Sequence, residues 1–170
     1  SLFGAQLAAA LGMPYAFASH FAPDHLDEAL MIYRRDFRPS ARLREPYAAA
    51  ALSAVAADTT AEAEYIASSM MQNFVALRTG RPGKLPPPVE NYVASLPPSA
   101  SAMLGHVLQC SAFGSVEDVA RGIARFITRT QVDEVIVHSP AFDPEARLKS
   151  VALIADAFRA VGAGQTTAPA

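Results

Sequence analysis

The sequence has no tryptophan, a single cysteine and no excess of either charge. The lone Cys110 excludes an intramolecular disulfide framework and a cysteine-rich zinc site, and it fits a reducing, cytoplasmic setting. Basic residues number 14 and acidic residues 16, so the formal net charge is −2, whereas nucleic-acid-binding proteins carry a basic excess. No charge-free apolar run reaches the roughly 18 residues that suggest a membrane-spanning helix. We therefore expect neither a nucleic-acid partner nor a membrane span.

Several widespread catalytic motifs are also missing from the sequence. There is no G-x-S-x-G element, which argues against an α/β-hydrolase. There is no G-x-G-x-x-G or Walker motif, so a Rossmann-type dinucleotide site or a phosphate-binding P-loop has no support. No two histidines have i, i+4 spacing, and no compact set of histidines and carboxylates occurs, so no metal site is expected.

The composition is that of a folded protein, with 51% hydrophobic and 18% charged residues among 170. This length permits one sizeable core or a piece of a larger one. Apolar runs predict strands at 14–19, 47–56 and 132–137, and amphipathic or capped segments predict helices at 2–11, 25–36, 60–77, 102–109, 116–129 and from 143 onward. This alternation predicts parallel strands with right-handed crossovers. Two architectures are open: a small three-layer sandwich, or part of a (β/α)8 barrel, which typically needs about 250 residues.

The first residue is Ser rather than Met, and a helical pattern begins at once. The Ser1 hydroxyl is suited to cap the free N–H groups of the first turn, and Gly12 is suited to end the helix. A helix whose cap is the first residue normally has chain before it. We therefore expect an upstream portion that is cleaved or absent, which favours the barrel.

Two further segments differ from the rest of the chain. Residues 79–101 contain six prolines, too many for a continuous helix, so we expect an irregular insertion or lid near the carboxyl ends of the strands. Residues 162–170 are small and are predicted to form a disordered tail. One folded portion is thus expected at 1–161.

Seven segments taken in order carry a resemblance to a known family. They are SLFGAQLAA (1–9), GMPYAFASHF (12–21), YRRDFRPS (33–40), AADTTAEA (56–63), GSVEDV (114–119), DEVIV (133–137) and FDPEARL (142–148). In this order they resemble the bacterial luciferase-like flavin-dependent monooxygenase family. Each segment is weak by itself, and the succession is the specific signal. The resemblance runs from residue 1 to about residue 158 and covers only the later half of the family's chain.

The resemblance implies an α/β fold, the C-terminal part of a (β/α)8 TIM-type barrel with parallel strands. It further implies an oxidoreductase in which reduced FMN, supplied by a flavin reductase, reacts with O2 and a small organic substrate. The missing N-terminal half of the barrel would be a partner, and a homo-oligomer is compatible with the family. Two alternatives stay open: a deazaflavin (F420)-dependent oxidoreductase of the same fold, and a truncated, inactive chain that binds flavin or assists assembly.

The start of the first helix is the predicted cofactor site. Family members place a Ser-led helix start directly after the fifth strand, where it meets the flavin phosphate, and Ser1, Leu2, Phe3 and Gly4 match that segment. Independently of the family, free N–H groups and the positive end of a helix favour a phosphate, and glycine permits close approach. The alternative is an ordinary helix start without a ligand.

His20 is the predicted catalytic residue. It directly follows a predicted strand, and in a barrel that position lies at the carboxyl mouth, where catalytic groups gather. A histidine there can hydrogen-bond substrate or flavin and transfer protons near neutral pH; the alternative is a loop histidine bonded to nearby backbone. Ser19 is predicted to line the same mouth and contact the cofactor. His138 and Ser139 follow the last predicted strand, and we place them at the mouth without a catalytic role.

Overall fold

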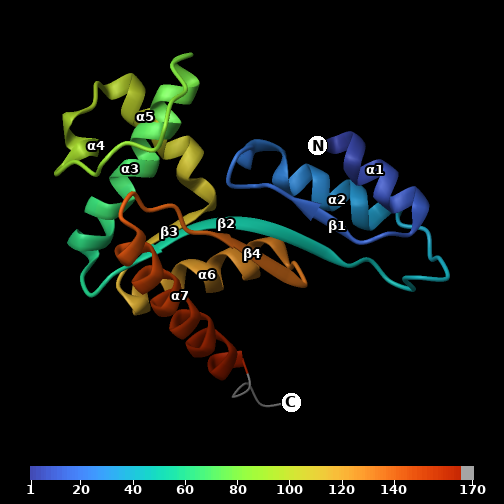
Figure 1. The fold of residues 1–170 in the computed structure, drawn as a ribbon. Helices are drawn as coiled ribbons and strands as arrows, with labels where there is room; N and C mark the ends of the chain where they lie inside the picture. The colour runs from blue at the N-terminus through green and yellow to red at the C-terminus, as the bar shows by residue number, and fades with distance from the viewer. Residues whose placement is uncertain (166–170) are drawn as a thin grey trace.

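The computed structural model describes residues 1–165 of the chain, which form a mixed α/β fold (Figure 1). The helices are α1 (Leu2–Leu11), α2 (Leu26–Asp36), α3 (Thr60–Arg78), α4 (Tyr92–Ser95), α5 (Pro98–Val107), α6 (Val116–Thr130) and α7 (Pro144–Gln165). The strands are β1 (Tyr15–Phe17), β2 (Ala48–Ala56), β3 (Ser111–Gly114) and β4 (Glu134–His138). Short 3-10 turns occupy Pro23–His25 and Leu108–Cys110. No helix of this described part is both long enough and apolar enough to cross a membrane.

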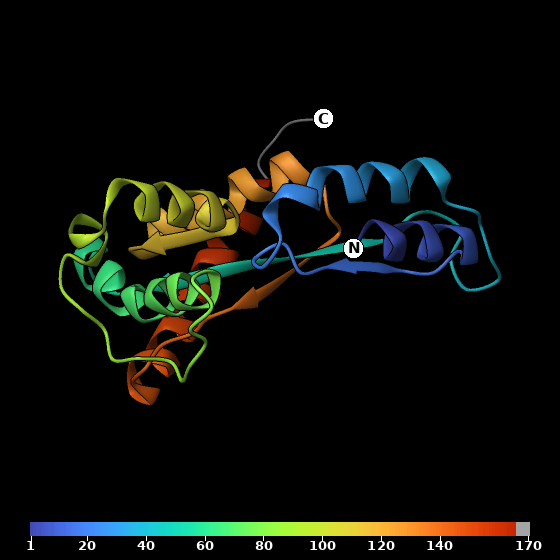
Figure 2. The same ribbon diagram turned by 90° about the horizontal axis from the view of Figure 1, so that it is seen from above.

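The sheet is parallel and is organised around β2. Residues 48–50 of β2 pair with β1, residues 49–53 pair with β4, and residues 53–56 pair with β3. The predicted parallel arrangement of the three apolar runs is therefore confirmed. In Figures 1 and 2 the strand arrows point toward the end of the molecule where α3, α4 and α5 gather. All carboxyl ends of the strands thus face the same end of the fold.

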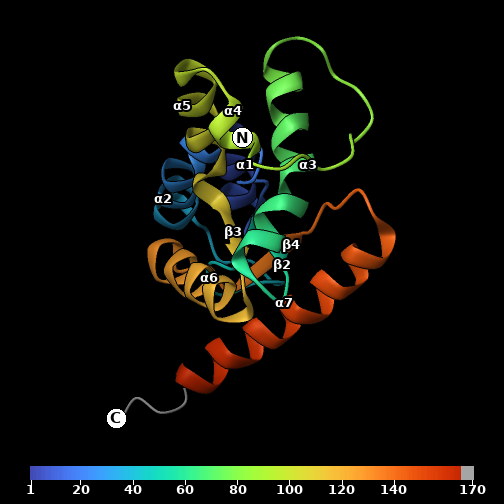
Figure 3. The same ribbon diagram turned by 90° about the vertical axis from the view of Figure 1, so that its left-hand side faces the viewer.

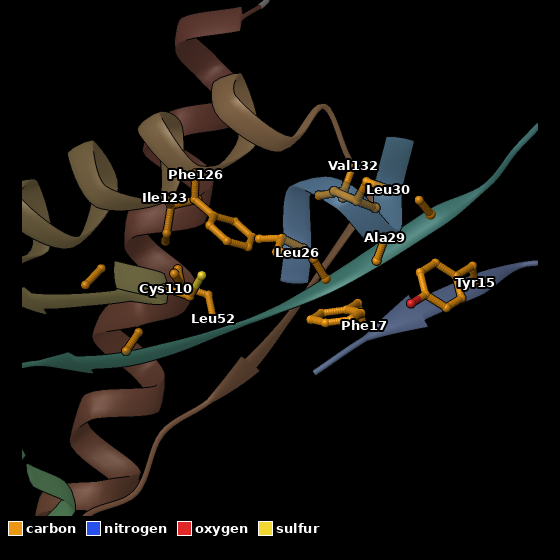
Figure 4. Packing of buried hydrophobic residues seen from close by; sticks show 14 of the residues in the cluster. Tyr15, Phe17, Leu26, Ala29, Leu30, Leu52, Cys110, Ile123, Phe126 and Val132 are labelled. Atoms are coloured by element: carbon orange, nitrogen blue, oxygen red, sulfur yellow. The ribbon is translucent and has the colours of Figure 1, made fainter. Parts of the chain in front are cut away.

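Both faces of β2 are buried along its whole length, as its nearly continuous apolar sequence predicts. One face, including Leu52, joins a core with α1, α2, α6 and α7 (Figure 4). The other face, including Val55, joins a second core with α3 and α5. Figure 3 shows the strands surrounded by helices, with α6 and α7 below them and α3 and α5 above. Small residues allow this close layering: a Cβ added to Gly122 of α6 would lie 2.6 Å from the Cβ of Ala112.

The region between α3 and α6 corrects one sequence-based prediction. A helix was expected at 102–109, but α5 begins at Pro98 and ends at Val107, and the short strand β3 follows where no strand was expected. Prolines at the first turn of α5 explain the earlier start, because proline suits the first helical positions. β3 has only four residues, too few for a periodic pattern, and it is a strand because it pairs with the end of β2.

The proline-rich segment lies along α3. Its part before α4 has no regular helix in the structure. Gln72 Nε2 donates a hydrogen bond to the Pro87 carbonyl oxygen (2.9 Å), and the Val89 N–H donates to Ser68 Oγ (2.7 Å). Figures 1 and 2 place it at the end toward which β2 points. The C-terminal boundary differs from expectation, because α7 continues to Gln165; positions 166–170 of the expected tail lie outside the described residues.

Candidate functional site

Two histidines meet at the carboxyl ends of β1 and β4. His20 lies in the loop after β1, His138 is the last residue of β4, and their ring centroids are 5.1 Å apart. The Phe21 ring lies 4.3 Å from the His20 ring and 6.4 Å from that of Phe74 on α3. The sequence predicted both histidines at the carboxyl ends of strands. In the structure their rings are in contact, and the Phe21 and Phe74 rings lie next to them.

The surroundings of both imidazoles favour their neutral forms. Burial lowers the pKa of His20, and the neighbouring His138 lowers it further. Burial also lowers the pKa of His138, and the positive charge of Arg147 on α7 acts in the same direction. Both causes penalise the protonated form, because burial removes hydrating water and a nearby positive charge repels an imidazolium. A neutral imidazole offers one N–H donor and one nitrogen acceptor.

Within residues 1–165, three buried side-chain polar atoms have no hydrogen-bond partner: His20 Nδ1, Ser53 Oγ and, on α3, Ser69 Oγ. Ser53 is the register partner of His138 in the β2–β4 pairing, so the two side chains stand on the same face of the sheet. Buried polar groups are normally satisfied by protein or water, and an orphaned one calls for a further partner. His20 Nδ1 and Ser53 Oγ therefore have unused hydrogen-bonding capacity, and Ser53 lies beside His138 in the sheet.

Ser53 is the residue beside His138 that sequence reasoning missed as a site residue. The available signal was its position as the single hydroxyl in the apolar run 47–56, apart from the tyrosine that opens it. Ser139 directly follows β4, and its Oγ lies 3.2 Å from Ser150 Oγ, which accepts from the Ala56 N–H at 3.0 Å. That pair ties α7 to β2.

Ser19 has a clear positioning contact. Its fully buried hydroxyl donates to the Ala51 carbonyl oxygen at 2.5 Å, which fastens the loop before His20 to β2. Ser19 also lies beside Cys110, whose thiol pKa is raised chiefly by burial. Its predicted contact with a cofactor stays a prediction, and the hydroxyl proton is already engaged by the backbone.

The start of α1 forms the predicted cap. Ser1 Oγ accepts from the Gly4 N–H at 3.2 Å, and Tyr15 Oη donates to the Ser1 carbonyl oxygen at 3.1 Å. Burial raises the pKa of Tyr15 to about 12, so it remains a donor at neutral pH. The first turn has no acidic residue, which leaves the positive end of the helix uncompensated and suited to an anion.

The α1 start lies at the same end of β1 as His20, as the views in Figures 1 and 2 agree. A Cβ added to Gly4 would lie 3.4 Å from Ser1 Oγ, an ordinary contact. Crowding within the chain therefore does not require glycine there. A phosphate-bearing cofactor fits this arrangement, because an uncompensated helix start and unpaired polar atoms lie at the same end of the sheet.

A separate cavity of about 500 Å3 lies between α3 and residues 89–94. Tyr65, Met71 and Phe113 contribute to its lining, and the two histidines do not. We place the chemistry at the histidines rather than in this cavity, because only the former combine polar groups that lack partners with pKa values shifted by burial. Among residues 1–165, no group of three or more His, Cys, Asp or Glu side chains is arranged to hold a metal ion.

No family model matches the chain, but curated relatives do. An Escherichia coli (strain K12) protein named "Luciferase-like monooxygenase" is 46% identical over 156 residues, which is 92% of this chain and 47% of that protein. The Bacillus subtilis protein named "Uncharacterized protein YvbT" is 40% identical over 157 residues, again 92% of this chain and 47% of its own length. The chain thus spans about half the length of the curated relatives it matches.

Solved structures agree on the fold. The crystal structure of apo-MsnO8 has a TM-score of 0.74 at 24% identity and covers 94% of this chain and 48% of its own. DmoA from Hyphomicrobium sulfonivorans has a TM-score of 0.56 at 16% identity, over 94% of this chain and 40% of its own. These neighbours are barrel enzymes of which the chain matches about half, so the three-layer sandwich is excluded. These similarities support the luciferase-like monooxygenase family for this chain over about half of a member's length, and its parallel strands form part of a (β/α)8 barrel.

Proposed function

We propose that this chain supplies part of the active site of a flavin-dependent monooxygenase, which uses reduced FMN and O2 to oxidise a small organic substrate. The observation that carries the proposal is the His20–His138 pair with its unpaired neighbour Ser53, at the end of a barrel sheet where active sites lie. The 46% identity to a protein named luciferase-like monooxygenase supports the reaction class. A structural neighbour described as riboflavin lyase (RcaE) with modified FMN and riboflavin supports a flavin, at TM-score 0.53 and 17% identity.

The start of α1 would bind the FMN phosphate. The backbone N–H groups of Leu2 and Phe3 point out of the first turn, and Ser1 contributes a hydroxyl that still has its proton to donate. The helix end adds a favourable electrostatic potential without any acidic residue to oppose it. This arrangement anchors the ligand and sets its orientation toward the carboxyl ends of the strands.

His20 would serve the reacting end of the ligand. Its ring is held between Phe21 and His138, and its loop is fastened to β2 by Ser19. The bound reduced flavin supplies the electrons that activate O2. His20, whose lowered pKa favours the neutral form near pH 7, can accept a proton from a bound group at a ring nitrogen or return one to it.

The proposal is tested with the longer protein that contains this chain and completes the barrel. Reduced FMN and reduced deazaflavin F420 are titrated separately, and O2 consumption is followed with each. We expect FMN to bind and to support O2 consumption when a flavin reductase regenerates it. Binding of F420 with hydride transfer and no O2 consumption would favour the deazaflavin oxidoreductase. Failure to bind either cofactor would favour the inactive assembly protein.

A further inference from the structure

The His20–His138 contact gives the second histidine a function that its position alone does not suggest. The two rings come from different strand ends, lie 5.1 Å apart at their centroids and are tilted by 39°. His138 is exposed, whereas His20 is half-buried and its Nδ1 atom is fully covered. The pair therefore runs from solvent toward the interior of the site.

Two arginines lie at the pair. Arg147 of α7 acts on His138, and Arg78 of α3 donates to the Phe21 carbonyl oxygen at 3.4 Å, beside His20. β2 contributes the uncharged Ser53. Within residues 1–165, no carboxylate is among the groups that shift either imidazole. Two imidazoles in contact, without a compensating negative charge, cannot easily both be protonated.

We propose that His20 and His138 act as one coupled proton carrier, which holds at most one proton near neutral pH and passes it between solvent and a group of a bound ligand. No direct hydrogen bond joins the two rings within residues 1–165. A proton that binds His138 from solvent therefore passes to His20 through a bridging water, and a proton leaves from the other His20 ring nitrogen to an oxygen or nitrogen of the ligand. Both imidazoles are then neutral, and the reverse path returns a proton to solvent. No oxidant or leaving group is needed for this transfer.

The use of this proton in catalysis rests on the proposed monooxygenase function, whereas the coupling is a property of the chain itself. The coupling is tested by histidine 15N NMR of the full chain over a pH series. In the unchanged protein we expect both rings to report two titration steps. In His138→Asn, the His20 midpoint should rise by on the order of 0.5 to 1 pH unit, because a repelling neighbour is gone. His20→Asn should have the reciprocal effect on His138.

The matched control is His25→Asn. His25 is exposed and lies in the 3-10 turn a few residues beyond His20, so its removal should leave both midpoints unchanged. A midpoint that stays the same when the other histidine of the pair is replaced overturns the proposal. If His138→Asn does not fold, the unchanged protein still decides: independent single-step curves for the two rings overturn the coupling, and shared two-step curves support it.

The catalytic half is tested in the longer protein with the barrel complete. We expect His20→Asn and His138→Asn each to reduce kcat and to move its pH profile, and the double variant to be no slower than the slower single variant. Coupled NMR titrations together with an unchanged kcat and pH profile in both variants would overturn the catalytic role. Absence of any flavin-dependent oxidation in the unchanged protein, with the NMR coupling intact, would instead overturn the proposed function and leave the proton pair standing.

Discussion

At the amino end of the sheet Tyr33 and Asp133 have hydrogen-bond partners on β2 or just before it, whereas toward the carboxyl end His20 Nδ1 and Ser53 Oγ have none. At the amino end, Tyr33 Oη accepts from the N–H of the residue just before β2 at 3.0 Å, and Asp133 Oδ2 accepts from the Ala48 N–H at 2.8 Å. These contacts hold the entry into β2 and β4.

The contrast follows what a barrel requires of its two ends. The amino end has only to close the fold, so every donor there is best satisfied within the chain. Tyr33 is an example of a group satisfied within the chain, because its hydroxyl also lies 2.8 Å from the Met13 carbonyl oxygen and 3.1 Å from the Tyr47 carbonyl oxygen. In the proposed function the carboxyl end binds a ligand, and the unpaired His20 Nδ1 would be available to it. Substitutions at the two ends should accordingly separate stability from function.

The largest effect is expected from His20→Ala in the protein with the complete barrel. Loss of a general acid–base residue lowers turnover by about 10²- to 10⁴-fold, while FMN affinity should change much less. Steady-state kinetics and an FMN titration measure the two effects. An equal loss of binding and turnover would mean that His20 holds the ligand rather than moving a proton.

Ser1→Ala should act mainly on cofactor binding. Loss of a hydrogen bond to a charged group costs about 1.5–3 kcal/mol, or roughly 10- to 150-fold in affinity. The effect should fall toward the lower end because the backbone N–H donors of α1 remain. Fluorescence titration with FMN measures it, and riboflavin, which lacks the phosphate, is the control ligand. A similar loss of riboflavin affinity would argue against phosphate binding at α1.

Tyr33→Phe should lower stability without changing the chemistry. It leaves the partly buried Tyr47 N–H and the Met13 carbonyl oxygen without this partner, which costs about 1–3 kcal/mol in the free energy of unfolding. Urea unfolding measures the change. Tyr65→Phe is the matched control, because Tyr65 on α3 is exposed and its hydroxyl should contribute little. An unchanged unfolding midpoint in Tyr33→Phe would show that the hydrogen bonds at the amino end of the sheet do not stabilise the fold.

The two buried serines should respond in opposite directions. Ser53→Ala removes a hydroxyl that has no partner, so stability should be unchanged or rise by about 1 kcal/mol. Ser19→Ala removes the hydrogen bond to Ala51 and leaves a buried carbonyl oxygen unpaired, so stability should fall by about 1–3 kcal/mol. Paired unfolding curves test this. A loss in Ser53→Ala as large as that in Ser19→Ala would show that Ser53 serves the fold.

The smallest effect expected is a pH dependence of stability from the histidine pair. The pKa values of His20 and His138 are lowered in the folded state, so below about pH 6.5 the unfolded chain binds protons that the folded chain resists. Stability should therefore fall as the pH decreases from about 6.5, and no such contribution exists well above it. Thermal unfolding at pH 7.5 and 5.5 measures the drop, which should shrink in the His20→Asn, His138→Asn double variant.

Much of the fold follows from local sequence patterns. The run at 47–56 predicted a doubly buried strand because its side chains are small and apolar throughout, and β2 occupies Ala48–Ala56. Ser1 and Ser115 predicted helix starts, and both hydroxyls accept the expected backbone N–H. Such features depend on residues within a few positions of each other, and chain order together with strand–helix alternation then dictates parallel pairing.

The features of the fold and of the candidate site that the sequence did not predict depend on contacts between segments that are distant in the sequence. Ser111–Gly114 forms β3 because it pairs with the end of β2. Four residues are too few to show a strand pattern in the sequence. Ser53 lies beside His138 only because the two residues are in register in the β2–β4 pairing, although they are 85 positions apart in the sequence. His20 and His138 likewise meet only once β1, β2 and β4 are aligned. Sequence alone places residues at strand ends, but register and loop path decide which side chains touch, because these are set by packing across the whole sheet.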